Sequence, residues 1–212
     1  MPGIVIETSR LRLRALRDDD LADLVGMAGD WAVACWLAQM PHPYTEVDGR
    51  AWIERVQQDH ETGRPVRFAI ALKSGDRLIG CAGLDGSTGD GSAEPALGYW
   101  LGRAHWGRGF GREAVAAVLD HGLNRLALSV IRAYTDPANA ASQKLLLACG
   151  LERRGEIDLL HPTRHGAARA PLFRIVRRAG AEATEAPSIR STDRVSIEPQ
   201  CATKASGRTF DG

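Results

Sequence analysis

A glycine-rich loop between an apolar strand and an amphipathic helix is the feature that most restricts how this chain can fold. The loop is Gly107-Arg-Gly-Phe-Gly111, and glycines at alternate positions let a backbone turn where a Cβ atom would block it. An apolar run over residues 95–101 precedes it, and the N–H groups and dipole of the helix that follows favour a bound phosphate. We therefore expect backbone amides to form a phosphate cradle, with Arg108 and Arg112 at its rim.

The same glycines fit three further kinds of loop to different degrees. A tight strand-to-helix turn without a ligand stays open. A dinucleotide-binding G-x-G-x-x-G motif counted from Gly109 ends on Ala114, an allowed substitute, and Asp136 follows where a ribose-binding acid is expected. After Asp136, however, the chain offers one helix and one hairpin, too few strands for a doubly wound sheet. A P-loop is excluded because no Gly-Lys-Ser/Thr follows the glycines.

The hydrophobic pattern of residues 1–178 predicts one α+β domain built on a mixed sheet. Strands are expected at 10–15, 68–72, 78–84, 95–101, 130–135, 152–160 and 170–177. Helices are expected after Asp18-Asp-Asp20, over 30–40, over 45–60, after the glycine loop and over 139–149. Residues 179–212 contain few large apolar side chains, so they are predicted to form a disordered tail. Docking of this tail on the domain stays open.

Composition excludes several classes of protein. The chain has 27 Lys and Arg against 26 Asp and Glu, and this balance argues against nucleic acid and anionic membranes as partners. The four cysteines lie 46 or more positions apart, which is not a metal-binding spacing, so no metal is expected. Without a membrane-length apolar run or a signal-peptide pattern, we expect a cytoplasmic protein with reduced thiols.

Four motifs carry a resemblance to a known family. They are Leu97-Gly-Tyr-Trp-Leu101, Trp106-Gly-Arg-Gly-Phe-Gly-Arg-Glu-Ala114, Asn139-Ala-Ala-Ser142 and Cys149-Gly-Leu151. Together they resemble the GNAT superfamily of acyl-CoA-dependent N-acetyltransferases. Within it, the chain is similar to the RimJ/RimL branch, which acetylates α-amino groups of ribosomal proteins. The resemblance covers about residues 7–177. It implies a mixed, mostly antiparallel sheet of about seven strands, with helices on both faces and splayed central strands.

The resemblance also implies acetyl-CoA as the co-substrate and no metal. Its pyrophosphate would bind the loop formed by Trp106, Gly107, Arg108, Gly109, Phe110, Gly111 and Arg112. Trp106 stands where the family has Gln or Arg, which leaves the backbone donors in place. Trp100 and Leu101 would pair with the pantetheine arm through their strand. Asn139 would contact the pantetheine amide, cap the helix that follows it, or do both.

For catalysis, the resemblance assigns Ser142 to a position near the sulfur, where it would protonate the departing thiolate. The alternative is a helix serine bonded to the carbonyl four residues earlier. Ala96 stands where the branch often has Glu, and Glu94 lies on the same strand face. Glu94 is therefore the candidate general base, against a solvated carboxylate or no dedicated base. His42, His60, His105 and His165 are expected at the surface.

The expected reaction is direct attack of a primary amine on acetyl-CoA in a ternary complex, by a monomer or homodimer. In this family, acceptor specificity comes from segments that correspond here to residues 31–44 and 161–169. The first offers an apolar wall and the second is basic, and neither has an acidic cluster to bind a polycation. A protein or peptide α-amine, or a small amine, is therefore expected. A non-catalytic acyl-CoA sensor or interaction domain of the same fold stays open.

Overall fold

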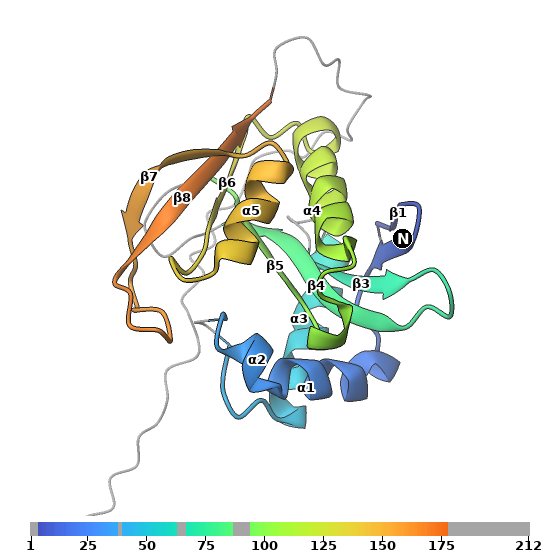
Figure 1. The fold of residues 1–212 in the computed structure, drawn as a ribbon. Coiled ribbons are helices and arrows are strands. Elements are labelled where there is room, and N and C mark those ends of the chain that lie inside the picture. Colours follow the sequence, from blue (N-terminus) through green and yellow to red (C-terminus); the bar gives the residue numbers. More distant parts are fainter. Residues whose placement is uncertain (1–3, 38–39, 63–66, 87–93, 178–212) are drawn as a thin grey trace, which may run out of the picture.

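The computed structural model describes residues 4–37, 40–62, 67–86 and 94–177 (Figure 1). Its elements in chain order are β1 (Ile6–Glu7), β2 (Leu11–Arg14), η1 (Asp18–Asp20), α1 (Leu21–Gly29), α2 (Trp31–Ala34), α3 (Glu46–Thr62), β3 (Arg67–Leu72), β4 (Leu78–Asp85), β5 (Ala96–Leu101), η2 (Arg103–His105), α4 (Phe110–Asp120), η3 (His121–Arg125), β6 (Val130–Tyr134), α5 (Ala140–Ala148), β7 (Glu152–Asp158) and β8 (Arg169–Val176). Residues 179–212 lie outside the described part of the chain, so the division into a domain and a tail stays a prediction.

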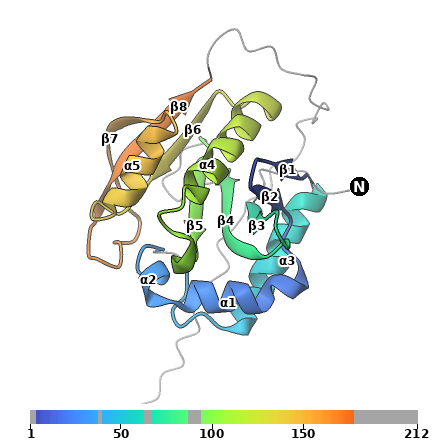
Figure 2. The same cartoon turned by 45° about the vertical axis from the view of Figure 1, so that its right-hand side comes forward.

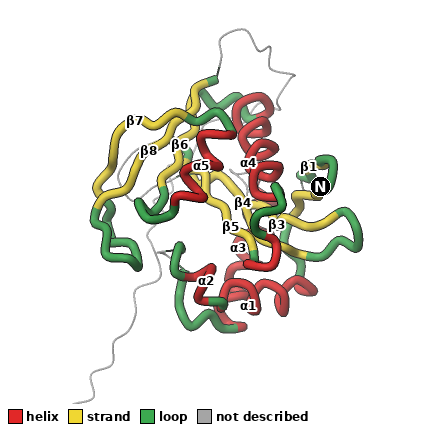
Figure 3. Tube along the Cα trace, viewed as in Figure 1, coloured by secondary structure: helices red, strands yellow, loops and turns green. Residues whose placement is uncertain are grey.

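The strands form one sheet in the order β1-β2-β3-β4-β5-β6-β8-β7 (Figure 3). All neighbours are antiparallel except β5 and β6, which run parallel. The mixed, mostly antiparallel sheet expected from the sequence is confirmed. It has eight strands instead of about seven because Ile6–Glu7 pairs with β2. Parallel neighbours need a long crossover, and here it contains the glycine loop and α4.

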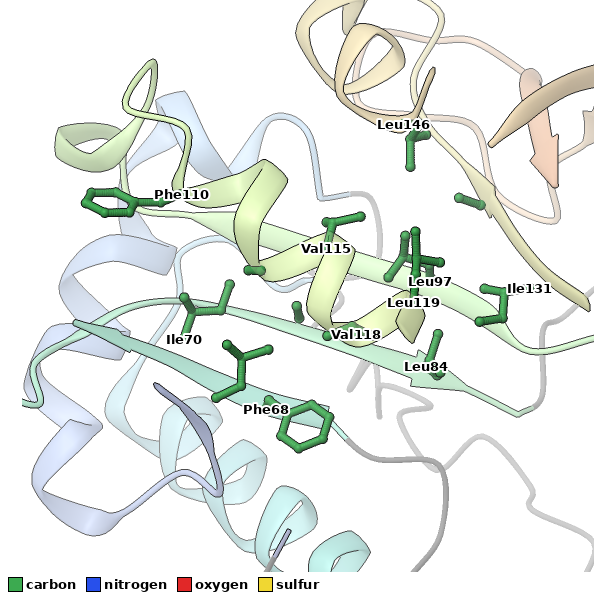
Figure 4. Close-up of a cluster of buried hydrophobic side chains, with 14 of the residues drawn as sticks. Phe68, Ile70, Leu84, Leu97, Phe110, Val115, Val118, Leu119, Ile131 and Leu146 are labelled. Carbon is green, nitrogen blue, oxygen red and sulfur yellow. The ribbon is translucent and has the colours of Figure 1, made fainter. Parts of the chain in front are cut away.

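Helices cover both faces of the sheet, as expected (Figure 2). On one face, side chains of α4 and α5 pack against those of the sheet in an apolar cluster, of which Figure 4 labels Phe68, Ile70, Leu84, Leu97, Phe110, Val115, Val118, Leu119, Ile131 and Leu146. On the other face, α1 and α3 bury Leu24, Ile53 and Val56 against Ala69 and Cys81. Consecutive strand residues alternate between these layers, so Tyr99 packs in the first and Trp100 in the second.

Capping side chains mark the starts of α3 and α2. Thr45 and Asp48 form a capping box before α3, since the Thr45 amide donates to the Asp48 carboxylate at 2.8 Å. The helix expected over residues 30–40 is only one turn long. Its start is capped by Asp30, whose carboxylate accepts from the Ala32 amide at 2.9 Å, and α2 ends at Ala34.

The helix expected after Asp18–Asp20 is confirmed as α1, which follows a short 3₁₀ turn of these three acids and has Asp20 at its N-cap position. A prediction for the preceding strand is wrong. Arg14 alternates with apolar residues, a pattern that predicts a solvent-facing side chain, but it is 3% exposed and donates to both carboxylate oxygens of Asp20, at 2.7 and 2.9 Å. The physical reason is that a buried guanidinium needs a charged partner, and Asp20 is turned inward to supply it.

Strands β4 and β5 approach each other unusually closely at Gly80. A Cβ atom there would lie 2.2 Å from the carbonyl oxygen of Trp100 and 2.8 Å from the Cα atom of Leu101. Both are backbone atoms, so no side-chain movement can make room. Glycine at this position therefore lets β5 reach the start of the glycine loop in the observed register.

Candidate functional site

The glycine loop has the open backbone geometry that the sequence predicts. Gly107 and Gly109 have φ angles of 71° and 79°, a region that favours glycine. Gly109 is the N-cap of α4, so N–H groups in the first helical turn have no partner within the helix. A Cβ atom at Gly107 would meet nothing within 4 Å. The loop therefore presents backbone donors beside open space, which suits a phosphate.

Gly111 and Phe110 contribute differently. A Cβ atom at Gly111 would lie 2.9 Å from Cδ1 of Leu145, so this glycine lets α4 pack closely against α5. Phe110 is 6% exposed, with its ring in the apolar core. Their predicted role in binding acetyl-CoA therefore rests on backbone amides alone.

The indole of Trp106 fixes the loop to the end of β5. Its Nε1 donates to the carbonyl oxygen of Leu101 at 2.7 Å, while 43% of the residue stays exposed. The structure thus gives the Trp106 side chain a local structural role, in a position where the family has Gln or Arg.

Arg10 is a residue of the loop's surroundings that the sequence did not reveal. Its guanidinium carbon lies 4.5 Å from the centroid of the Phe110 ring, and its Nη1 donates to the carbonyl oxygen of Arg108 at 3.0 Å. The guanidinium of Arg108 lies 5.3 Å from the same centroid, and Arg112 is exposed on the first turn of α4. The loop therefore has three arginines around it. The contact between Arg10 and Arg108 spans almost a hundred positions, and no local pattern announces it.

Glu113 holds Arg10 in place. Its carboxylate accepts from the Thr8 and Ser9 hydroxyls at 2.6 and 3.0 Å, and from the amide and Nε of Arg10 at 2.8 and 2.7 Å. Burial by itself raises the pKa of Glu113, but these hydrogen bonds outweigh burial and lower that pKa to about 2. These contacts hold the N-terminal strands against α4, the helix that follows the phosphate loop.

Strands β5 and β6 separate after one backbone pair, which confirms the splayed centre of the sheet. The pair is Ala96 with Arg132, where the Arg132 amide donates to the Pro95 carbonyl at 3.0 Å. On the other side of β5, the Gly102 amide donates to Ile79 of β4. Backbone groups alternate along an antiparallel strand, so those of residues 97, 99 and 101 face the opening.

This alternation changes one predicted contact. The carbonyl of Trp100 points towards β4, next to Gly80, so the Trp100 backbone does not lie at the open edge. Leu101 does face the opening, although its carbonyl is already bonded to Trp106. Leu97 and Tyr99 therefore offer the open-edge groups that were expected from Trp100.

Tyr99 and Ser142 meet at the mouth of the opening. The Tyr99 hydroxyl lies 2.8 Å from Oγ of Ser142, and burial raises the pKa of Tyr99 to about 12. Asn139 caps α5, because its side chain accepts from the Ser142 amide at 3.0 Å. The structure thus shows the capping role expected for Asn139 and pairs Ser142 with a tyrosine that the sequence did not suggest.

Glu94 lies just before β5, near the closed end of the opening. It forms an ion pair with Arg174 of β8, and both side chains are partly buried. Beside them, Arg132 of β6 is 3% exposed and pairs in register with Arg174. Glu94 is therefore one member of a charged cluster where the two parallel strands meet.

The two segments predicted to set acceptor specificity come together. Arg164, between β7 and β8, donates to the carbonyls of Leu37 and Met40, and Figure 1 shows this connection descending towards α2. The ring of His165 lies on Trp36, with centroids 4.5 Å apart. Tyr44 is buried in the core of the other face, 8% exposed, so this residue is not part of the apolar wall expected over residues 31–44.

The described ranges offer neither a membrane span nor a metal cluster. They contain no helix with the length and apolar character needed to cross a bilayer. They also contain no group of three or more His, Cys, Asp or Glu residues arranged to hold a metal ion.

Known proteins are similar in sequence to this chain over most of their length. The uncharacterized N-acetyltransferase p20 of Bacillus licheniformis is 35% identical over 150 residues, covering 70% of this chain and 82% of that protein. The protein YkkB of Bacillus subtilis strain 168 is 30% identical over 152 residues, covering 68% and 83%.

Solved structures share the fold at lower identity. The ribosomal-protein-S5-alanine acetyltransferase of Vibrio fischeri superposes with a TM-score of 0.71 at 19% identity, covering 84% of this chain and 99% of that one. Mycobacterium smegmatis RimJ in complex with CoA-disulfide gives 0.71 at 18% identity, covering 86% and 93%. Residues 10–152 match the family model of the acetyltransferase (GNAT) domain. With the splayed strands and the glycine loop, this match shows that the chain belongs to the GNAT family of acyl-CoA-dependent N-acetyltransferases.

Proposed function

We propose that this protein transfers the acetyl group of acetyl-CoA to a primary amine, by direct attack of the amine within a ternary complex. The observation that carries the proposal is the continuity of the open edge of β5 with the glycine loop at one end and with the pair of Tyr99 and Ser142 beside it. Acetyl-CoA supplies an activated acyl carbon, and the chain's own residues bind it, orient it and transfer protons.

The residues fit the co-substrate. Backbone amides between Trp106 and Arg112 would hold the pyrophosphate, since the space beside Gly107 is open and Gly109 begins α4. Arg10 adds a positive charge that sits 48% exposed at this loop. The open-edge groups of Tyr99 and Leu97 would pair with the pantetheine arm, and the Asn139 amide group would contact the same arm while its oxygen caps α5.

Ser142 is our candidate for the proton donor to the departing thiolate. Its hydroxyl is held by Tyr99 at 2.8 Å and not by a helix carbonyl. A tyrosine with a pKa of about 12 is protonated at neutral pH, so it can replenish the proton that Ser142 delivers. An N–H group on the open edge of β5 would stabilise the oxyanion that develops on the acyl carbon.

The acceptor we propose is a protein or peptide α-amine, or a small amine. Trp31 and Trp36 provide an apolar surface, and Trp31 is 54% exposed. The neighbouring cations and carboxylates are already paired, Arg164 with carbonyls and Asp136 with His165. The names of two structural neighbours describe ribosomal-protein acetyltransferases, and a third is named an alpha-N-protein acetyltransferase, which supports an α-amine.

Thiol release from acetyl-CoA tests the proposal. The purified protein is mixed with acetyl-CoA and a panel of peptides with free α-amines, each matched to the same peptide with its α-amine already acetylated, together with small amines. We expect one class of free amine to accelerate thiol release and to gain the mass of an acetyl group. Binding of CoA without acceleration by any amine would instead support a non-catalytic acyl-CoA sensor.

A further inference from the structure

A buried carboxylate and a histidine meet at the carboxyl end of β6, on the acceptor side of the opening. We propose that His165, oriented by Asp136, is the group that removes the proton from the acceptor amine. The proposal rests on the function proposed above, and it replaces Glu94 as the candidate base. From the sequence, His165 was expected at the surface and Asp136 was considered only as a ribose ligand.

Asp136 is built to orient a partner. The residue is 6% exposed, and its carboxylate accepts from the Ala138 amide at 2.8 Å and from His165 Nδ1 at 2.9 Å. Burial raises the pKa of Asp136, but hydrogen bonds from Thr163, Ala138 and His165 outweigh it and hold that pKa below its ordinary value. Asp136 is therefore an anion that stays charged beside the imidazole.

The orientation of His165 follows from that anion. A carboxylate only accepts hydrogen bonds, so Nδ1 of His165 carries a hydrogen, and in the neutral imidazole the lone pair is on Nε2. The ring also lies on Trp36 at an interplanar angle of 34°, and 39% of the side chain is exposed. His165 thus presents a basic nitrogen that a substrate can reach, with its tautomer and its plane both fixed.

The position of the pair relates it to the reacting atoms. The Asp136 carbonyl accepts from the Asn139 amide at 2.9 Å, and Asn139 in turn caps the first turn of α5, where Ser142 contacts Tyr99. A continuous series of hydrogen bonds therefore joins His165 to the residues that we place at the sulfur.

The charges near His165 come from several elements. Asp136 approaches from the end of β6, and Arg164 adjoins His165 in its own segment. The Cys35 thiol, just after α2, interacts with the charges of Asp136, Arg164 and Asp30. Burial, followed by the charge of Asp136, raises the pKa of the Cys35 thiol, so the thiol stays neutral near pH 7. Arg164 is occupied by the carbonyls of Leu37 and Met40. Asp136 is therefore the anion in direct contact with the imidazole.

The step balances without any further reactant. Neutral Nε2 takes one proton from the acceptor ammonium, and the amine nitrogen then bonds to the acyl carbon. The carbon–sulfur bond breaks and leaves its electron pair on sulfur, which receives a proton from the Ser142 and Tyr99 pair. The nitrogen passes its second proton to the Ser142 and Tyr99 pair, which replaces the proton that the pair gave to sulfur. The products are the amide, the free thiol and protonated His165, which returns its proton to solvent.

Glu94 is a less suitable base because its carboxylate is committed to Arg174. Protonating Glu94 would leave the guanidinium of Arg174 without its ion-pair partner, in a cluster that already contains buried Arg132. Protonating Nε2 of His165 breaks no such ion pair, since Nδ1 makes the contact with Asp136.

The test compares His165→Gln, Asp136→Asn, Glu94→Gln and a control, Glu54→Gln, which alters an exposed residue of α3 outside the site. The acceptor is the free-amine peptide with the highest turnover in the panel above, or the best small amine if none of the peptides is acetylated. Initial rates of thiol release across pH give kcat and KM for each variant. CoA binding by calorimetry and thermal melting show whether the fold and the donor site are intact.

We expect His165→Gln to lower kcat/KM by about 100-fold or more at about pH 6.5 and to remove the acid limb of its pH profile. The deficit should shrink above about pH 8 for an α-amine, which is then already neutral. Asp136→Asn should lower kcat by a smaller factor. Glu54→Gln should leave kcat and KM unchanged, and all four variants should bind CoA as the wild type does.

Two results would overturn the proposal, and they are distinguishable. If no amine in the panel is acetylated, the proposed function fails and this proposal fails with it. If the enzyme acetylates an amine but His165→Gln keeps the wild-type pH profile, only this proposal fails. Loss of the acid limb in Glu94→Gln instead of His165→Gln would identify Glu94 as the base.

Discussion

Replacing Glu113 by Gln should destabilise the protein in a pH-dependent way. The carboxylate accepts four hydrogen bonds from Thr8, Ser9 and Arg10, and these lower its pKa from 4.5 to about 2. Each pKa unit corresponds to about 1.4 kcal/mol, so the shift corresponds to about 3 kcal/mol before solvent is considered. Arg10 is about half exposed, and screening reduces the expected loss to about 1–2 kcal/mol.

The sign of the pH dependence follows from the lowered pKa. The stabilisation is fully present above pH 4.5, where Glu113 is charged in the folded and unfolded states, and it is lost as pH falls towards 2. Urea unfolding at neutral pH should therefore show the full difference in unfolding free energy between Glu113→Gln and wild type. Thermal melting should show a Tm lower by about 2–8 °C. At about pH 3 the difference should be less than half as large.

The matched control is Glu54→Gln, an exposed glutamate on α3, which should change the unfolding free energy by less than about 0.5 kcal/mol. Equal effects of the two substitutions, or a Glu113→Gln difference that stays constant with pH, would refute the reasoning. Either result would mean that the hydrogen bonds to Glu113 contribute no net stability.

Three further substitutions test the site and the sheet. Gly109→Val should abolish CoA binding measured by calorimetry, because φ is 79° and the new side chain starts 3.3 Å from Nη2 of Arg10; unchanged affinity would show that the loop has only a structural role. Ser142→Ala should lower kcat more than it weakens CoA binding, and the opposite pattern would make Ser142 a binding residue. Gly80→Ala should lower the unfolding free energy by about 2–3 kcal/mol, because its Cβ atom would meet backbone atoms of β5. Its control is Gly26→Ala in α1, which should not destabilise the protein, since a Cβ atom there would have no atom within 4 Å.

The sequence predicted most elements of the fold because they are long enough to show a period. The hairpin of β3 and β4, the splayed strands β5 and β6 with the helix between them, and the closing hairpin of β7 and β8 were all expected. Strand β1 was not, because two residues are too few for an alternating pattern. Helix α2 was predicted too long, because the apolar residues after Ala34 keep a helical spacing without forming a helix.

The glycine loop and Ser142 could be found because their motifs are local. Arg10 beside the loop, Tyr99 on Ser142 and Asp136 on His165 could not, since each contact joins segments that only the folded sheet brings together. Buried Arg14 was misplaced for the same kind of reason. Strand alternation predicts which way a side chain points, but not that Asp20 will follow it into the interior.

The single bridge between Ala96 and Arg132 divides the sheet into a five-stranded section and a three-stranded section, joined elsewhere through the packing of α4 and α5. A ligand that pairs with β5 and touches α5 would add a second link between these sections. Binding of CoA to the native state should therefore add about 2.7 kcal/mol to the free energy of unfolding at a hundred times Kd, and so raise the melting temperature. It should also slow amide exchange along β6, a strand that the phosphate loop itself does not include.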